Sequence, residues 1–155
     1  MKNNDSKTQN GISRKLRDAI AAFSLKRLAR ALCLGTVASE EASDEILYGL
    51  PGIFSMEISA AGARVRLIKE ANTLRIMRSS EKSEPLLRLH LEDLAVLGDI
   101  VGRECTLQKA LAEGRMTFAG KTTHLATIMR ASAAGDKTVL PNEEYCELYG
   151  KKKED

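Results

Sequence analysis

The stretch Leu107-Gln-Lys-Ala-Leu-Ala-Glu-Gly-Arg-Met-Thr-Phe-Ala-Gly120 joins two secondary-structure patterns at one glycine. Its first seven residues predict a short helix, and Thr106 in front of them is a suitable N-cap. Gly114 ends that helix, because glycine readily adopts the left-handed backbone found at helix ends. Met116 and Phe118 then alternate with polar residues, which predicts a strand. Fourteen residues thus predict a helix, a tight stop and a strand.

The sequence before this stretch changes its hydrophobic period twice. Apolar residues at spacings of three to five (Leu16, Ile20, Phe23, Leu28 and Leu32) predict a helix from Ser13 to about Leu34, ended by Gly35. Ser39 predicts the cap of a second helix over residues 39–50. Alternating apolar residues then predict strands near 54–59, 64–67, 74–76 and 87–91, with tight turns at 60–62 and 70–73. The first three strands are expected to form antiparallel hairpins.

Helical spacing returns on either side of the opening stretch. Residues 92–101 predict one helix, and Thr122 or Thr123 begins a last one that ends near Gly135. Residues 1–11 are polar and are expected to be a disordered tail, and residues 136–155 a weakly ordered one. Residues 12–135 are therefore expected to form a single domain.

Composition excludes several classes of protein. The 155 residues are 43% hydrophobic and 29% charged, and no apolar run approaches the ~20 residues that span a bilayer. The polar N-terminus does not resemble a secretory signal, so a soluble, cytoplasmic protein is expected. A net charge of +3, 4% aromatic residues and no Trp give no indication of nucleic-acid binding.

The cysteines and histidines do not predict a metal site. Cys33, Cys105 and Cys146 are far apart in the sequence, and no cluster of His, Cys and carboxylates has ligand spacing. His90 and His124 are interpreted as surface or capping residues, because neither has an evident nucleophile or carboxylate partner. We expect no metal, no cofactor and no catalytic residue.

The order of elements from residue 54 onward resembles the sterol carrier protein type 2 lipid-binding domain. Two motifs carry the resemblance: Leu89-His-Leu-Glu-Asp-Leu94, where a strand meets an acidic helix start, and the opening stretch at 107–120. The resemblance covers about residues 50–135. It implies an α+β fold with a mostly antiparallel five-stranded sheet, covered on one face by helices, to which this chain adds an N-terminal helix.

The resemblance also implies an apolar tunnel between helices and sheet that holds a fatty-acyl, sterol-like or isoprenoid ligand. The protein would then bind and transfer or present a lipid without catalysis. A filled core explains the same residues, and the domain would then be a protein-interaction or accessory module of a biosynthetic complex. The side chains expected to line the tunnel are Phe54, Met56, Leu94, Leu97, Val101, Leu107, Leu111, Met116, Phe118, Leu125, Ile128 and Met129.

The segment Gly114–Thr122 is similar to a phosphate-binding loop but has five residues between its glycines where that motif has four. It is therefore interpreted as a helix stop followed by a strand and a turn. Backbone amides at the start of the following helix remain candidates for an anionic lipid head group, with Gly120, Lys121 and Thr122 as the residues concerned.

The predicted N-terminal helix is basic. Residues 14–30 contain six basic side chains and one acidic side chain, Asp18. The basic residues are Arg14, Lys15, Arg17, Lys26, Arg27 and Arg30. One interpretation is transient contact with an anionic membrane or a partner protein. The other is a solvated face whose apolar stripe packs on the domain.

Overall fold

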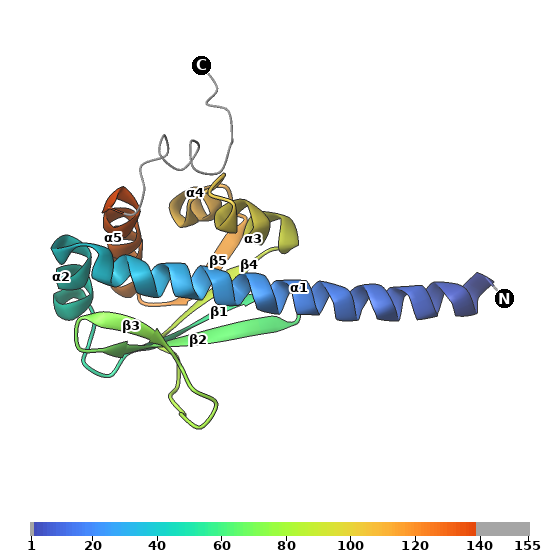
Figure 1. The fold of residues 1–155 in the computed structure, drawn as a ribbon, viewed down its shortest axis with the longest axis horizontal. Helices are drawn as coiled ribbons and strands as arrows, with labels where there is room; N and C mark the ends of the chain where they lie inside the picture. Colours follow the sequence, from blue (N-terminus) through green and yellow to red (C-terminus); the bar gives the residue numbers. More distant parts are fainter. Residues whose placement is uncertain (1, 139–155) are drawn as a thin grey trace, which may run out of the picture.

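Helices and strands follow one another in the predicted order in the computed structural model, which describes residues 2–138 (Figure 1). The helices are α1 (Lys2–Ala38), α2 (Glu40–Gly49), α3 (Leu94–Val101), α4 (Leu107–Ala112) and α5 (Thr122–Thr138). The strands are β1 (Ser55–Ala60), β2 (Ala63–Glu70), β3 (Thr73–Ile76), β4 (Leu87–Leu91) and β5 (Met116–Gly120).

The strands form one open sheet in the order β3-β2-β1-β4-β5. The hairpins β1–β2 and β2–β3 are antiparallel, as predicted, and so is the pair β4–β5. Only β1 and β4 run parallel, because the chain crosses from one side of β1 to the other before β4 begins. The sheet is therefore mixed but mostly antiparallel, which confirms the predicted fold class.

The two faces of the sheet differ in chemistry. Ile58, Leu89 and Phe118 lie side by side in the register, so their side chains share the core face. On the opposite face Glu57 lies within 4 Å of three guanidinium groups, those of Arg64, Arg66 and Arg88. The alternation of apolar and charged residues along each strand produces this division.

The helices cover the core face unevenly. In Figure 1, α1 crosses the sheet as one long rod, and it contacts β1, β2 and β3. The short helices α3 and α4 lie toward β4 and β5, and α5 packs against α1 and α2. One side of the sheet thus lies beneath a continuous helix, whereas the side near β5 lies beneath short segments.

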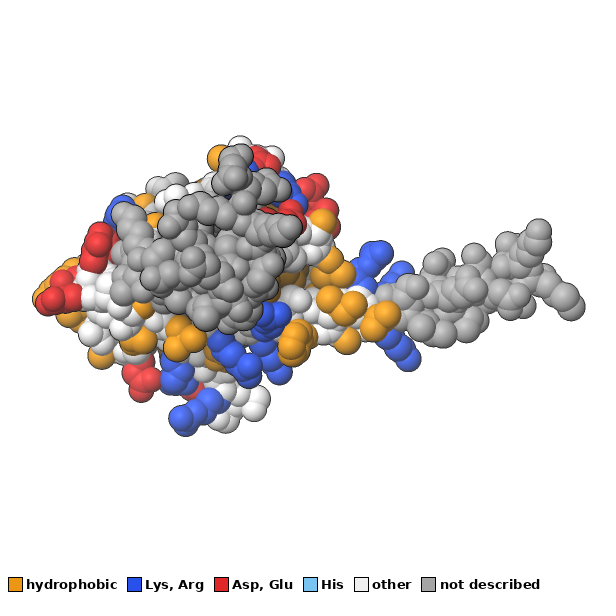
Figure 2. All heavy atoms as spheres, turned by 45° about the horizontal axis from the view of Figure 1, so that its top comes forward, with side chains coloured by type: hydrophobic (Ala, Val, Ile, Leu, Met, Phe, Trp, Pro, Cys, Tyr) orange, Lys and Arg blue, Asp and Glu red, His pale blue; other side chains and the backbone are white. Residues whose placement is uncertain are grey.

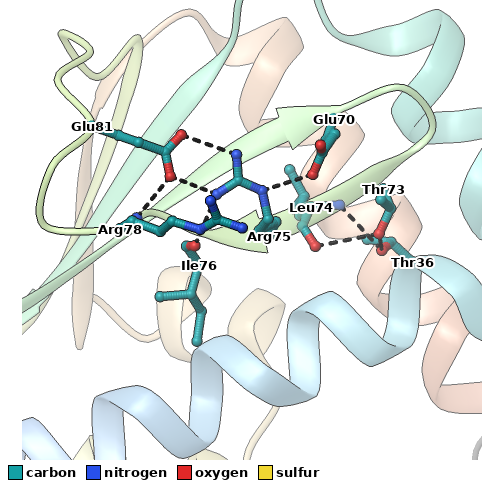
Figure 3. Close-up of polar contacts among 8 residues, drawn as sticks. All are labelled: Thr36, Glu70, Thr73, Leu74, Arg75, Ile76, Arg78 and Glu81. Carbon is teal, nitrogen blue, oxygen red and sulfur yellow. Dashed lines mark hydrogen bonds and ion pairs between the residues drawn. The ribbon is translucent and has the colours of Figure 1, made fainter.

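Thr36 joins the end of α1 to the edge strand β3 (Figure 3). Its Oγ1 donates to the carbonyl of Cys33 and lies 2.8 Å from Oγ1 of Thr73. The backbone amide of Leu74 also points at Thr36 Oγ1, at 3.4 Å. An edge strand has amides with no neighbouring strand to accept from them, and the buried Thr36 hydroxyl satisfies one.

Arg75 holds the polar link between β3 and β4 against β3 (Figure 3). Two of its guanidinium nitrogens donate to the two carboxylate oxygens of Glu81, at 2.6 and 3.0 Å, while Nε donates to Glu70. The hydrogen bonds from Arg75 and from the Arg78 amide lower the pKa of Glu81 to about 2. This bidentate pair fixes a link that lacks regular structure of its own.

Helix α1 extends past both of its predicted limits. It begins at Lys2 instead of Ser13, so residues 2–11, which were predicted to belong to a disordered tail, have helical backbone in the structure. It also continues through Gly35 to Ala38, because Gly35 and Thr36 are buried against the domain. That burial outweighs the ~1 kcal/mol that glycine costs inside a helix. The division into one domain with two tails stays a prediction.

The face that α1 buries is not the one the sequence spacing predicts. Leu28 and Leu32 are buried together with Ala21 and Leu25, whereas Leu16, Ile20 and Phe23 are exposed. The predicted stripe mixed two faces, because the five-residue step from Phe23 to Leu28 places Leu28 about 140° around the helix from Phe23. The alanines between the large residues let α1 lie close to the sheet on the other face.

The predicted local signals elsewhere are confirmed. Ser39 Oγ accepts from the Ala42 amide at 3.0 Å, and Thr106 Oγ1 accepts from the Lys109 amide at 3.0 Å. Gly114 follows α4 with a φ of 74°, in the left-handed region. Helix α5 continues past its expected end at Gly135 to Thr138, and the rest of the predicted C-terminal tail, residues 139–155, lies outside the described residues.

Candidate ligand-binding site

The β5 edge is the least covered part of the core face. Phe118 is 36% exposed, although its neighbour in the register, Leu89, is 1% exposed. Met116, two residues earlier and on the same face, is also fully buried. The helix layer therefore covers the beginning of β5 and leaves its middle partly open.

A crevice of about 210 Å³ lies between the start of α4 and the middle of α5. Leu107, Met129 and Ala133 provide apolar wall, and polar groups are interspersed with them. The polar lining residues are Thr106, Gln108 and Ser132. The crevice is smaller than the ~300–1,000 Å³ typical of small-molecule sites, so a ligand larger than a short chain would have to widen it.

The predicted tunnel-lining residues divide into four groups. Two of them, Leu107 and Met129, line this crevice. Leu125 is buried in the core, and Leu94, Val101, Leu111 and Phe118 are partly buried or half-exposed. Five have at most 1% of their surface exposed and pack in the core, namely Phe54, Met56, Leu97, Met116 and Ile128. Their role as a tunnel wall stays a prediction.

The head-group candidates lie away from the crevice. Gly120, Lys121 and Thr122 are exposed where β5 turns into α5. Thr122 precedes Met129 by seven residues and Ala133 by eleven, which at 1.5 Å per residue is about 10–16 Å along the helix. The fold does not bring the candidates to the crevice mouth, and head-group binding there stays a prediction.

Gly120 is constrained by the neighbouring strand. Its φ is 130°, and a Cβ at this position would lie 2.4 Å from the carbonyl oxygen of Leu86. Only glycine lets the two backbones approach so closely. The role of Gly120 that the structure displays is therefore the close pairing of β5 with β4.

His124 faces the interior from the first turn of α5. Its ring meets the ring of Phe54 edge-on, with centroids 5.4 Å apart, and its Nδ1 is buried without a hydrogen-bond partner among the described residues. Burial, reinforced by the charge of Lys121, lowers the pKa of His124. This environment favours a neutral imidazole packed against an aromatic ring.

A second hollow, about 630 Å³ and open to solvent, follows the outer side of α2. Four carboxylates line it, those of Glu40, Glu41, Asp44 and Glu45. Glu45 also accepts a hydrogen bond from Arg130 of α5 at 3.1 Å. An open, acidic surface does not suit an alkyl chain, so the α4–α5 crevice is the better candidate site.

Sequence reasoning missed most of the crevice lining. Thr106 was identified only as a helix cap, while Gln108, Ser132 and Ala133 were not singled out. Met129, Ser132 and Ala133 follow helical spacing of three and four residues, which is the one signal that could have grouped them. Among the residues whose side chains the structure describes, 14–133, no set of three His, Cys or acidic groups could hold a metal ion. No helix in the described part of the chain has the length and apolar character needed to cross a bilayer.

No family model matches the chain, and no curated protein does. Solved structures with a similar fold are found. The UbiJ-SCP2 ubiquinone synthesis protein shares 11% identity over 77% of this chain and 93% of its own, with a TM-score of 0.50. Sterol carrier protein domain 2 of Helicoverpa armigera shares 13% identity over 76% and 92%, also with a TM-score of 0.50.

A larger enzyme contains a partly similar region. The sec-alkylsulfatase Pisa1 from Pseudomonas sp. shares 15% identity over 56% of this chain, with a TM-score of 0.41, and the chain spans only 13% of that enzyme's length. The UbiJ and Helicoverpa armigera domains, by contrast, match over nearly their whole length. These two matches confirm the resemblance at the level of fold: the chain folds as a sterol carrier protein 2-type domain.

Proposed function

We propose that the domain binds an apolar lipid without catalysis and transfers or presents it, and that the ligand enters at the α4–α5 crevice. The observation that carries the proposal is the crevice itself, whose apolar wall includes Leu107 and Met129. The names of two proteins with this fold support the ligand class, since one is a sterol carrier protein and the other serves ubiquinone synthesis. A fatty-acyl, sterol-like or isoprenoid chain fits this description.

Burial of hydrocarbon supplies the binding free energy in this proposal. Each methylene that leaves water contributes about 0.8 kcal/mol, so a chain of a few carbons gains several kcal/mol before its ordering is counted. In this proposal the ligand widens the crevice by displacing Met129 and α4. Met129 has a flexible thioether chain, and α4 is a helix of only six residues whose own backbone bonds are few.

A second candidate is an interaction or accessory module with a closed core. The dense packing of Phe54, Met56 and Leu97 favours it, because these side chains already fill the space beneath the helices. In this case the crevice is a surface depression that no lipid enters. The two candidates differ in one measurable property, the uptake of an alkyl chain.

Replacement of Ala133 with Phe tests the proposal. Ala133 lines the crevice and is only partly buried, so the larger ring fills the space without displacing the core. We expect at least tenfold weaker uptake of a fluorescent fatty acid, and loss of co-purifying lipid in native mass spectrometry. Ala112→Phe, at the exposed end of α4, is the matched control and should bind normally.

The closed-core candidate gives a different result. A wild-type protein with a clean apo mass and no fatty-acid uptake would eliminate lipid binding. If the wild type, Ala133→Phe and Ala112→Phe take up the fatty acid equally, the protein binds lipid at a site other than the crevice.

A further inference from the structure

Helix α1 has an outer face that nothing among the described residues covers. Five large apolar side chains on it are about half to two-thirds exposed: Leu16 at 60%, Ile20 at 48%, Phe23 at 64%, Leu34 at 64% and Val37 at 60%. Exposed apolar groups are ordinary singly, but a row of them marks an interaction surface. Figure 2 shows apolar and basic side chains mixed on the helix where it leaves the body.

The row has the spacing of a coiled-coil seam. Together with Arg27 and Arg30, which are also exposed, the five apolar residues lie at alternating steps of four and three along α1. We call this set the outer seam: Leu16, Ile20, Phe23, Arg27, Arg30, Leu34 and Val37. It spans 22 residues, about 32 Å of helix, and its 3.5-residue period is the one that a packed partner helix follows.

The outer seam is cationic at its centre. Arg27 and Arg30 interrupt the apolar row, and neither forms an ion pair with an acid of residues 14–133. Asp18, the one acid in residues 14–38, points to the opposite side and accepts from the Gly62 amide at 3.3 Å. A partner must therefore offer apolar side chains at both ends and carboxylates in the middle.

We propose that the outer seam binds an amphipathic helix of a partner protein, with Asp or Glu opposite Arg27 and Arg30 and apolar residues on either side. Guanidinium groups pair bidentately with carboxylates, which fixes the register of the two helices. The proposal concerns the outside of α1 and does not depend on what the α4–α5 crevice binds.

A second copy of the chain fits the seam poorly. Parallel alignment of two α1 helices places Arg27 and Arg30 opposite their own counterparts. In an antiparallel pair centred on the seam, Arg27 still meets Arg27, while Arg30 faces Phe23. Like charges that meet in an interface repel each other, which disfavours self-pairing. A bilayer also fits poorly, since a helix lying on a membrane places its cations beside the apolar face and not along its middle line.

Two synthetic peptides test the proposal against these alternatives. Both are 22-residue amphipathic helices with Leu at seam positions; one has Glu at the two central positions and the other has Lys. Fluorescence anisotropy measures their binding to the full chain. We expect the Glu peptide to bind at least tenfold more tightly than the Lys peptide, and the double variant Arg27→Glu/Arg30→Glu to reverse that preference.

The matched control changes the same charge on the same helix but off the seam. Arg14→Glu/Arg17→Glu leaves the outer seam intact, since neither position belongs to its 3-4 row, and should keep the wild-type preference. Equal binding of the two peptides, or no binding of the Glu peptide, would overturn the proposal.

Two further measurements identify the alternatives directly. If vesicles of phosphatidylcholine and phosphatidylglycerol sediment the wild type and both double variants lose that binding equally, the surface serves a membrane. If sedimentation velocity shows a dimer that Leu16→Ser/Phe23→Ser dissociates, the seam joins two copies. Either result overturns the partner-helix proposal.

Discussion

Two parts of the sheet, β1–β2 beneath α1 and β5 at one edge, are packed differently, although the strands in both parts alternate apolar and polar residues. Under α1, the core-face residues of β1 and β2 are sealed; Ile58 and Leu67 have no exposed surface. At β5, Met116 is buried opposite Leu91, but Phe118, two residues further along the strand, is 36% exposed. The difference follows from the covering layer, which is one continuous helix on the first side and short helices on the second.

This contrast shows how one fold can combine a fully buried core with a partly exposed edge. A long helix lying across several strands fills every position beneath it at once, and close packing then excludes voids. Short helices such as α4 make fewer contacts with the sheet and leave room between themselves. The candidate site lies on this second side, where a ligand would displace least.

The largest expected effect comes from replacing one core-face residue with alanine beneath α1 and one at β5. Leu67→Ala leaves a cavity under α1 and should lower the free energy of unfolding by about 2–5 kcal/mol. Phe118→Ala removes more atoms from a half-open position and should cost only about 1–2 kcal/mol, because solvent already reaches the ring. Urea denaturation followed by circular dichroism measures both, and an equal loss would contradict the contrast.

A smaller effect is expected where β5 joins β4. Gly120→Ala forces a side chain into a φ of 130° and against the Leu86 carbonyl, and should cost about 1–3 kcal/mol. Gly98→Ala, in α3, is the control, since a Cβ there meets nothing within 4 Å and should stabilise the helix by up to ~1 kcal/mol. If both variants melt at the wild-type temperature, β5 is not held by close backbone approach.

The smallest effect is a pH dependence that arises at His124. Because burial lowers its pKa, the folded chain takes up a proton there less readily than the unfolded chain does. The stability from its neutral ring is therefore complete above the unfolded value of 6.5 and decreases as the pH falls through 6.5 toward the lowered pKa. His124→Phe should lose less Tm between pH 8 and 5 than the wild type.

His90→Gln provides the comparison for that experiment. His90 is exposed and hydrogen-bonded to Ser59, so His90→Gln removes an imidazole without altering the packing beside Phe54. Parallel profiles for the wild type and His124→Phe would show that His124 does not report on packing beside Phe54.

Local signals predicted more of this protein than long-range ones. The caps at Ser39 and Thr106, the stop at Gly114 and the two hairpins involve neighbours in the chain, so their geometry follows from a few adjacent residues. The prediction of which face α1 buries was wrong, because both faces of the helix carry apolar residues at helical spacing. No property of the helix alone says which face meets the sheet.

The candidate site was predicted only in part for the same reason. Leu107 and Met129 were chosen as apolar residues on the right elements and do line the crevice, whereas Ser132 and Ala133 are too small and too common to be noticed in a sequence. The crevice exists because α4 and α5 do not meet fully. That spacing depends on every side chain between the two helices.

The sequence by itself determined the order of the elements, their caps and turns, and the apolar face of each strand, because all of these depend on residues within a few positions of one another. Only the tertiary structure decided that the centre beneath α1 is filled, that the opening lies between α4 and α5, and that α1 keeps an apolar, cationic seam outside. Packing couples residues far apart in the chain, and its outcome depends on the sum of their shapes.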